Sequence, residues 1–200
     1  MKSPLRYLVT EFDTGAVSLI NGLSFLFERE EMPAELLRAI QIYSLDSYNA
    51  KGQIDKTSSR NVVFSVSKWV NAFAKQKNIP LKCKYLKADD VTIYEIVDCL
   101  KQNGCVFLKT YLGGAKHYVI LTAMDNEYIY MFDPYFKPNV SEKYKNVIHI
   151  IHDNPFAFNR RVSLEHFLTE KKSDLSLGVV AEREMVLFFR DDNAFARELV

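Results

Sequence analysis

The chain has 200 residues, and 48% of them are hydrophobic. A chain of this length buries about two-thirds or more of its unfolded surface, so a single domain spanning residues 1–200 can form its own core. The 26 basic residues nearly cancel the 25 acidic ones, which leaves no broad positive field for nucleic acid and no strong negative field for a basic partner. We therefore expect no nucleic-acid partner, and charge identifies no other ligand.

Further classes are disfavoured by the absence of their signals. The N-terminus lacks the apolar run of about 7 to 15 residues that a secretion signal needs, and no apolar stretch approaches the roughly 20 residues of a membrane span. The three cysteines, Cys83, Cys99 and Cys105, are an odd number without metal-ligand spacing, and the histidines also lack such spacing. We expect a soluble, cytoplasmic protein with no membrane partner, disulfide framework, metal or cofactor, and the oligomeric state stays open.

The first 80 residues carry apolar side chains at intervals of three and four, which is typical of amphipathic helices. One set predicts a helix in the segment that follows residue 14. A second predicts a helix opened by Pro33 and Glu35, since proline is tolerated in a first turn and acids suit the N-terminal dipole. A third helix is expected from about Ser58 to Gln76, after a polar loop over residues 46–59. The apolar positions are Val17, Ile20, Leu23 and Phe27; Leu36, Leu37, Ile40 and Tyr43; and Val62, Val66, Trp69, Val70 and Phe73.

After Pro80 the apolar runs become short, rich in β-branched and aromatic residues, and separated by turn signals. Strands are predicted at residues 81–86, 104–111, 117–124, 127–135, 147–151 and 184–189. Between the first two, residues 92–104 predict a short amphipathic helix closed by Gly104. Helices first and antiparallel strands second predict an α+β fold, with N-terminal helices packed on a C-terminal antiparallel sheet.

The first candidate site is an extended segment that passes through Asp13, Thr14 and Gly15 into an apolar helix. At a helix N-terminus the macrodipole stabilises an anion and backbone N–H groups point outward, so a reactive thiolate would be stabilised there. A simpler interpretation is that Asp13 or Thr14 is an N-cap that accepts a bond from a free N–H of the first turn. Taken alone, the motif favours the cap.

The second candidate is His117, which opens the predicted strand 117–124 just after the pair Gly113–Gly114. A histidine at a strand entrance can be anchored by the sheet and open to a cleft, as a general base must be. The alternative is an ordinary half-buried histidine.

The third candidate is Asp133, at the end of the next strand. Asp125 and Asn126 predict a tight turn between the two strands, and hairpin geometry then places His117 and Asp133 opposite each other. An aspartate that accepts from one ring nitrogen would fix the tautomer and orient the other nitrogen. By itself the Asp133–Pro134 dipeptide is a turn signal, so the cross-strand pairing carries the functional interpretation of both residues.

These residues, in this order, give the chain a resemblance to a known family. A nucleophile–Gly pair at a helix start, a histidine opening a strand and an Asp-Pro ending the next one resemble the papain-like cysteine peptidases of peptidase family C thirty-nine, the double-glycine leader peptidases, and their stand-alone relatives. The resemblance runs from about Tyr7 to Tyr135. It implies a papain-like fold in which Thr14–Gly15 lies at the family's Cys-Gly, His117 is the base and Asp133 orients the base.

The sequence departs from the family at the nucleophile. Thr14 stands where the family has cysteine, and the preceding segment has no glutamine for an oxyanion hole, although Thr10 or a backbone N–H could substitute. A cysteine thiol, with a pKa of about 8.5, ionises readily, whereas a threonine hydroxyl does not. Threonine nucleophiles usually rely on their own free α-amine, which residue 14 lacks. The three cysteines are expected to be buried thiols rather than replacement nucleophiles.

Three functions follow as hypotheses. The leading one is a cysteine-peptidase-like protein that has lost ordinary peptidase turnover and binds a peptide or acyl partner in the retained cleft. The second is an active hydrolase or acyltransferase that uses Thr14 or another nucleophile with His117 and Asp133, since some stand-alone relatives resemble butirosin biosynthesis protein H and are associated with acyl transfer. The third is a structural or interaction protein, which burial of His117 away from any cleft would favour.

Overall fold

The computed structural model describes residues 1–10, 13–44 and 59–191 of the chain. The helices are α1 (Thr14–Leu26), α2 (Ala34–Tyr43), α3 (Arg60–Gln76), α4 (Ile93–Lys101) and α5 (Leu164–Phe167). The strands are β1 (Leu81–Lys87), β2 (Cys105–Leu112), β3 (Ala115–Met124), β4 (Tyr128–Phe132), β5 (Ile148–Ile150), β6 (Arg160–Ser163) and β7 (Glu184–Arg190).

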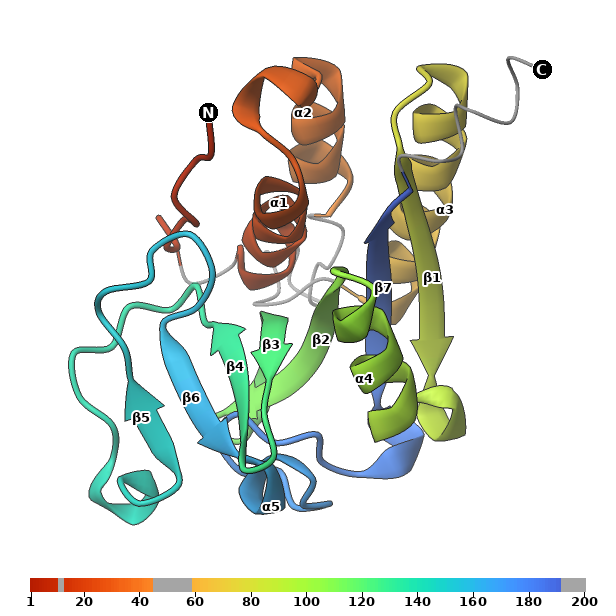
Figure 1. Cartoon of the computed structure of the whole chain (residues 1–200). Coiled ribbons are helices and arrows are strands. Elements are labelled where there is room, and N and C mark those ends of the chain that lie inside the picture. The colour runs from red at the N-terminus through yellow and green to blue at the C-terminus, as the bar shows by residue number, and fades with distance from the viewer. Residues whose placement is uncertain (11–12, 45–58, 192–200) are drawn as a thin grey trace, which may run out of the picture.

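Within these residues the strands form one sheet in the order β1-β7-β2-β3-β4-β6-β5, and all of its pairings are antiparallel (Figure 1). The strand that follows the N-terminal helices, β1, pairs with the last strand, β7. The ends of the described sheet-forming sequence are therefore joined at one edge, while the hairpin of β3 and β4 lies in the interior of the sheet.

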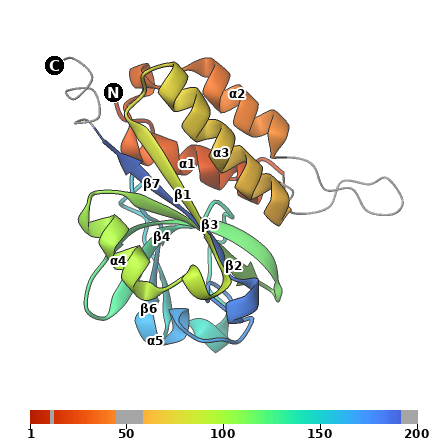
Figure 2. The same cartoon turned by 90° about the vertical axis from the view of Figure 1, so that its right-hand side faces the viewer.

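The sheet separates two hydrophobic cores, because successive side chains of a strand point to opposite faces. Helices α1, α2 and α3 cover one face and α4 covers the other (Figure 2). Phe107 and Tyr118 belong to the core beneath α1, with their rings stacked at a centroid distance of 4.8 Å. Val106 and Val119, their neighbours along the same two strands, belong to the core on the α4 side. The α+β architecture predicted from the sequence, with N-terminal helices packed on a C-terminal antiparallel sheet, is confirmed.

The predicted helices of the first half are present. Pro33 is the N-cap of α2 rather than a residue of its first turn, and Ser59 caps α3 by accepting from the N–H of Val62. Val63 and Ala74 take the centre of the buried stripe of α3, so Trp69, expected to be buried, lies at its edge and is only partly buried. The predicted start of this helix at Ser58, and all of the loop 46–59 except Ser59, lie outside the described residues.

Besides the short helix α5, which was not predicted, the second half shows two differences from expectation. Strand β6 was not predicted, because its four residues, two of them arginines, carry no apolar alternation. Helix α4 does end before Gly104, but the left-handed residue is Asn103, with φ of 57°. Gly104 is required for a different reason: a Cβ there would lie 2.6 Å from both the Cys99 sulfur and the Phe188 carbonyl oxygen.

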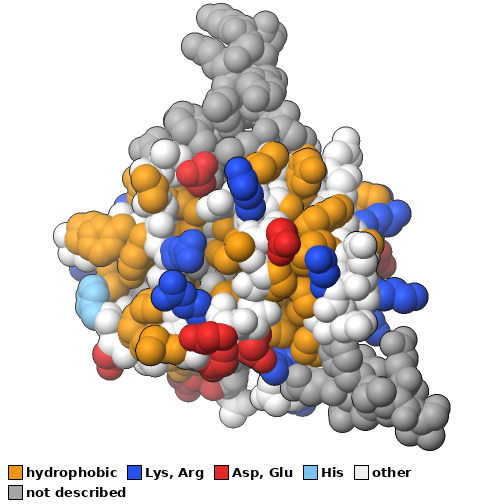
Figure 3. Space-filling model, turned by 90° about the horizontal axis from the view of Figure 1, so that it is seen from above, with side chains coloured by type: hydrophobic (Ala, Val, Ile, Leu, Met, Phe, Trp, Pro, Cys, Tyr) orange, Lys and Arg blue, Asp and Glu red, His pale blue; other side chains and the backbone are white. Residues whose placement is uncertain are grey.

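The exterior adds little to the identification of a partner. Among the described segments, none of the helices combines the length and apolarity that crossing a bilayer requires. The face seen in Figure 3 carries hydrophobic side chains interspersed with both basic and acidic ones. This mixture agrees with the near-zero net charge.

Candidate active site

Helix α1 crosses the sheet alongside β3, and two contacts fix its direction. The Ser18 hydroxyl donates to the carbonyl of Tyr118 at 2.8 Å, and one turn later the Cys105 thiol donates to the carbonyl of Gly22 at 3.4 Å. Cys105 begins β2, and the antiparallel pairing sets that end of β2 beside the far end of β3. The N-terminus of α1 therefore lies toward the beginning of β3, the end that carries His117.

Thr14 is the first residue of α1, and its hydroxyl makes no capping bond. Asp13 holds the N-cap position without a side-chain cap, and its carboxylate accepts from the Thr10 hydroxyl at 2.7 Å instead. Thr14 is only 5% exposed, and among the described residues its Oγ1 atom has no hydrogen-bond partner. The capping interpretation is wrong for both side chains. It also follows that Thr14 Oγ1 is not hydrogen-bonded to His117.

The structure brings His117 and Asp133 together. His117 Nε2 lies 2.7 Å from Asp133 Oδ1, and each residue is 3% exposed. Both belong to the same sheet face, since Ile120 pairs with Phe132 and Asp133 therefore lies beside Val119, two residues along from His117. The imidazole spans this offset, so the predicted contact is made although the two residues are not directly opposite.

The offset comes from the turn and from a bulge. Asp125 Oδ1 accepts from the N–H groups of both Glu127 and Tyr128, at 2.8 and 2.7 Å. This holds the turn one residue later than predicted, on Asn126 and Glu127. A β-bulge between Leu121 and Ala123 then shifts the register again, and bulges re-aim side chains in this way.

The hydrogen bond between His117 and Asp133 has a defined donor and acceptor. Burial raises the pKa of Asp133, but the His117 ring, the Arg160 guanidinium and the N–H of Tyr135 outweigh it and hold that pKa below its ordinary value. An ionised carboxylate only accepts hydrogen bonds, so Nε2 of His117 carries the hydrogen of this bond. Nδ1 is then the ring nitrogen that remains for a nucleophile or ligand, as a general base requires.

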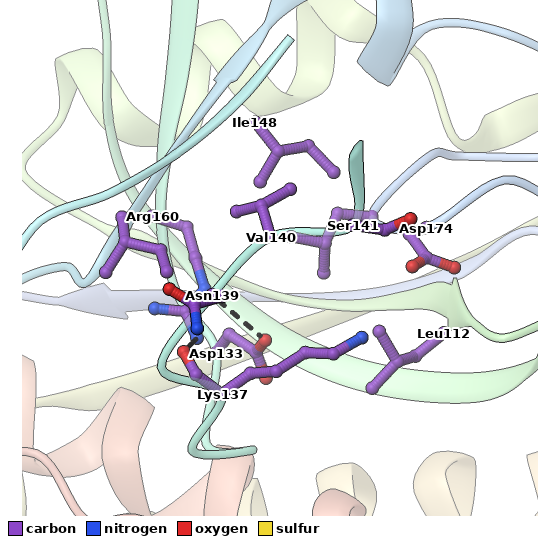
Figure 4. A pocket seen from close by; sticks show the side chains of 11 residues that line it. Leu112, Asp133, Lys137, Asn139, Val140, Ser141, Ile148, Arg160 and Asp174 are labelled. Carbon is purple, nitrogen blue, oxygen red and sulfur yellow. Dashed lines mark hydrogen bonds and ion pairs between the residues drawn. The ribbon is translucent and has the colours of Figure 1, made fainter. Parts of the chain in front are cut away.

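Asp133 is also held by two residues that the sequence did not indicate as part of the site. Asn159 brackets its backbone: the Asn159 side chain accepts from the Asp133 N–H at 2.8 Å and donates to the Asp133 carbonyl at 2.7 Å. Arg160 Nε lies 3.8 Å from Asp133 Oδ2 (Figure 4).

A small cavity reaches Asp133 on the α4 side of the sheet. Its volume is about 20 Å³, which is room for about one water molecule. Ile148 and Leu175, both members of the α4-side core, contribute to its walls, and His117 does not line it. Figure 4 shows the lining side chains, which are Leu112, Asp133, Lys137, Asn139, Val140, Ser141, Ile148, Ile150, Arg160, Asp174 and Leu175.

The strand that carries His117 is anchored on the α1 side by the next residue. The Tyr118 hydroxyl donates to buried Glu184 at 2.7 Å, and Tyr85 donates to the same carboxylate at 3.1 Å. Arg60 Nε lies 3.5 Å from Glu184. Burial raises the pKa of Tyr118 well above its usual value, so the phenol stays a donor. This network fixes the backbone beside His117.

None of the three cysteines is placed as a nucleophile. All of them are buried, and burial raises the pKa of each thiol, to about 12 for Cys99. The Cys105 thiol donates to the Gly22 carbonyl of α1, and the Cys99 thiol donates toward the carbonyls of Cys105 and Phe188. Because the thiolate is the reactive species, burial disfavours all three thiols as nucleophiles.

Comparisons with known proteins give matches at the level of structure. No protein-family model matches the chain, and no curated protein does. One similar solved structure is a double glycine motif protease from an AMS/PCAT transporter in complex with the leader peptide, at 13% identity, with a TM-score of 0.43 over 93% of this chain and 89% of that one. Another is a C thirty-nine-like peptidase from Bacillus anthracis, at 14% identity, with a TM-score of 0.48 over 92% of this chain and 93% of that one.

Proposed function

We propose that this chain is a peptidase-like protein that retains the histidine–aspartate half of a catalytic triad, has lost ordinary peptidase turnover, and binds a peptide or acyl group beside His117. The observation that carries the proposal is a contrast between the candidate residues. His117 and Asp133 are joined by a 2.7 Å hydrogen bond, whereas Thr14, at the helix start where the family's cysteine would stand, has no hydrogen bond to a base.

The chemistry of threonine supports the loss of turnover. A thiol at a helix N-terminus becomes a thiolate before it attacks, because the helix dipole and a histidine lower its pKa. A threonine hydroxyl must instead lose its proton to a base during the attack. Such a base has to lie within hydrogen-bond reach of the hydroxyl or one water away, and Thr14 Oγ1 makes no such bond.

An active hydrolase or acyltransferase that uses Thr14 is the second candidate. The observation in its favour is the same free hydroxyl: Thr14 Oγ1 is not engaged as a cap or in any other hydrogen bond among the described residues. This candidate requires that ligand binding bring the hydroxyl within hydrogen-bond reach of Nδ1 of His117, since catalytic hydrogen bonds often tighten only in the complex. Mass labelling of Thr14 in the unmodified protein by an acylating probe would establish this candidate and overturn the first.

The test of the main proposal is to restore the thiol with Thr14→Cys. The variant is treated with a thiol-directed acylating probe, and modification is followed by intact mass. We expect labelling about a hundredfold faster than in Thr14→Cys/His117→Ala, which is within the usual contribution of a positioned base. Cys83, Cys99 and Cys105 serve as internal controls because they are buried.

A matched control lies on the same helix. Ser18→Cys introduces a thiol one turn further along α1, where the hydroxyl bonds to the Tyr118 carbonyl rather than to a base. It should label no faster than the native cysteines. If Thr14→Cys behaves like Ser18→Cys, the catalytic arrangement is not assembled. The third hypothesis, a structural role for the His117–Asp133 pair, then takes its place, and the 3% exposure of His117 is the observation in its favour.

A further inference from the structure

We propose that Arg160 is a positioning residue of this site, which acts as the fixed counter-ion of Asp133 and holds the carboxylate so that Oδ1 faces Nε2 of His117. The inference deepens the proposed function and rests on it for its catalytic meaning. Its structural part, the coupling of Arg160 to Asp133, can be tested by itself.

The guanidinium of Arg160 is held in place on its far side. The residue is 5% exposed, and its two terminal nitrogens donate to three backbone carbonyls while Nε is left toward Asp133. These bonds run to Asn159 at 3.0 Å, Tyr135 at 3.4 Å and Lys137 at 3.3 Å. A guanidinium presents its donors in a rigid planar fork, so fixing its outer nitrogens also fixes the direction of Nε.

The carboxylate of Asp133 is divided between its neighbours. Oδ1 receives the His117 ring at 2.7 Å and the Tyr135 N–H at 2.8 Å, whereas Oδ2 faces Arg160 at 3.8 Å. Partners on both oxygens restrict rotation about the last side-chain bond. Arg160 thus sets the orientation of the group that sets the orientation of His117.

The charge balance favours this role. A buried carboxylate needs a partner of opposite charge, and arginine stays charged under all conditions of interest. The other charged groups that face this region are Lys137 and Asp174, which line the cavity but are only partly buried. Asp174 already accepts from the N–H of Gly113. Among the described residues, Arg160 is the buried cation whose charge is permanent and that lies within ion-pair distance of Asp133.

Two other carboxylates near the strand of His117 are already engaged elsewhere. On the α1 side Asp13 is bonded to Thr10. On the β7 side Glu184 is held by two tyrosines and Arg60. Neither carboxylate therefore competes for the guanidinium of Arg160.

The experiment separates the charge of Arg160 from its hydrogen bonds. In the Thr14→Cys background, Arg160→Gln keeps a donor for the carbonyls but removes the charge, and Arg160→Lys keeps the charge but loses the fork. Arg161→Gln is the matched control, because Arg161 is the next residue of β6 and its guanidinium lies over the Tyr128 ring, at 4.5 Å. The rate of acylation at position 14 is measured for each, with the melting temperature as a check of folding.

We expect Arg160→Gln to lower the acylation rate about tenfold to a hundredfold, the usual effect of losing a group that orients a functional residue, and Arg160→Lys and Arg161→Gln to keep most of it. Equal rates in Arg160→Gln and Arg161→Gln would overturn the proposal. So would an equal loss in the Gln and Lys variants, which would mean that Arg160 acts only by holding the carbonyls. If Arg160→Gln does not fold, Arg160→Lys decides, since a tenfold loss there contradicts a role for the charge.

A second readout does not depend on the proposed function. Titration of the Asp133 carboxyl by carbon-detected NMR, with Thr14 in place, should show a higher pKa in Arg160→Gln than in the unmodified protein, because the guanidinium no longer opposes burial. Arg161→Gln should leave it unchanged. If the pKa of Asp133 in Arg160→Gln equals that in the unmodified protein, the inference is wrong. The two readouts can disagree. If the Asp133 pKa shifts in Arg160→Gln but Thr14→Cys shows no His117-dependent labelling, the proposed function is wrong and the coupling of Arg160 to Asp133 stands.

Discussion

The sheet and the start of α1, which carry the candidate residues, are built very differently. On the sheet side, His117, Asp133, Asn159 and Arg160 come from three separate segments, and each makes hydrogen bonds or ion pairs with another member of the group. On the helix side, Thr14 is equally buried, but its hydroxyl has no partner among the described residues. The sheet side is a polar network whose members contact one another, and the helix side is a single unsatisfied group.

The difference shows which of these side chains contribute to the stability of the fold. A buried ionic network is stable only when every member is satisfied, so Asp133 and its partners depend on each other. An unsatisfied buried hydroxyl costs about 1–3 kcal/mol and returns nothing to the fold. The Thr14 hydroxyl therefore adds nothing to the stability of the fold.

The largest expected effect comes from breaking the network of His117, Asp133 and Arg160. Asp133→Asn leaves Arg160 buried without its counter-ion, and losing one member of a buried ion pair costs about 3–5 kcal/mol. Urea unfolding of the variant should show this loss. Asp174→Asn, which changes a more exposed carboxylate at the same cavity, should cost no more than about 1 kcal/mol. Similar losses in the two variants would contradict the view that the His117–Asp133–Arg160 network is special.

A smaller effect of opposite sign is expected on the helix side. Thr14→Val replaces the unpartnered hydroxyl by a methyl group of similar shape and should raise the free energy of unfolding by about 1 kcal/mol. Ser18→Ala, on the same helix, removes a hydroxyl that bonds to the Tyr118 carbonyl and should lower it by about 1 kcal/mol. Denaturant unfolding of both variants measures the contrast. A destabilised Thr14→Val would mean that the hydroxyl has a partner in solution.

The smallest effect is a pH dependence confined to acid. The pKa of Asp133 is lower in the folded protein than its ordinary value of about 3.9. This group therefore adds stability above about pH 3.9 that is lost as pH falls through the folded pKa, because the unfolded state binds the proton first. The unmodified protein should lose more stability than Asp133→Asn between pH 5 and pH 3, by at most about 1.4 kcal/mol for each unit of displacement. If the unmodified protein and Asp133→Asn lose the same free energy of unfolding between the two pH values, Asp133 does not contribute to the acid dependence of stability.

Much of the fold was predictable because it follows from local patterns. Apolar spacing located α1 and α2, and alternation with turn signals located β3 and β4. The contact of His117 with Asp133 was predictable for the same reason, since a hairpin brings nearby sequence together. The register was not, because the Asp125 side chain moves the turn and a bulge follows it.

The support of the site was hidden for a physical reason. Arg160 begins a strand of four residues that has no apolar alternation, and Asn159 directly precedes it. The two residues lie 27 and 26 positions after Asp133 in the sequence. Nothing local marks a residue whose partner is supplied by another strand. Thr14 was expected to be capping the helix if it was not catalytic, and only the placed side chain shows that it makes no capping bond.

The sequence by itself determined the fold class, the hairpin that joins His117 to Asp133, and the threonine at the helix start, because each depends on residue type and spacing over short distances. The tertiary structure alone decided that the three thiols are buried, that Arg160 balances Asp133, and that the Thr14 hydroxyl is unpaired. Burial and charge pairing are set by segments that meet only when the chain folds, and no local pattern records them.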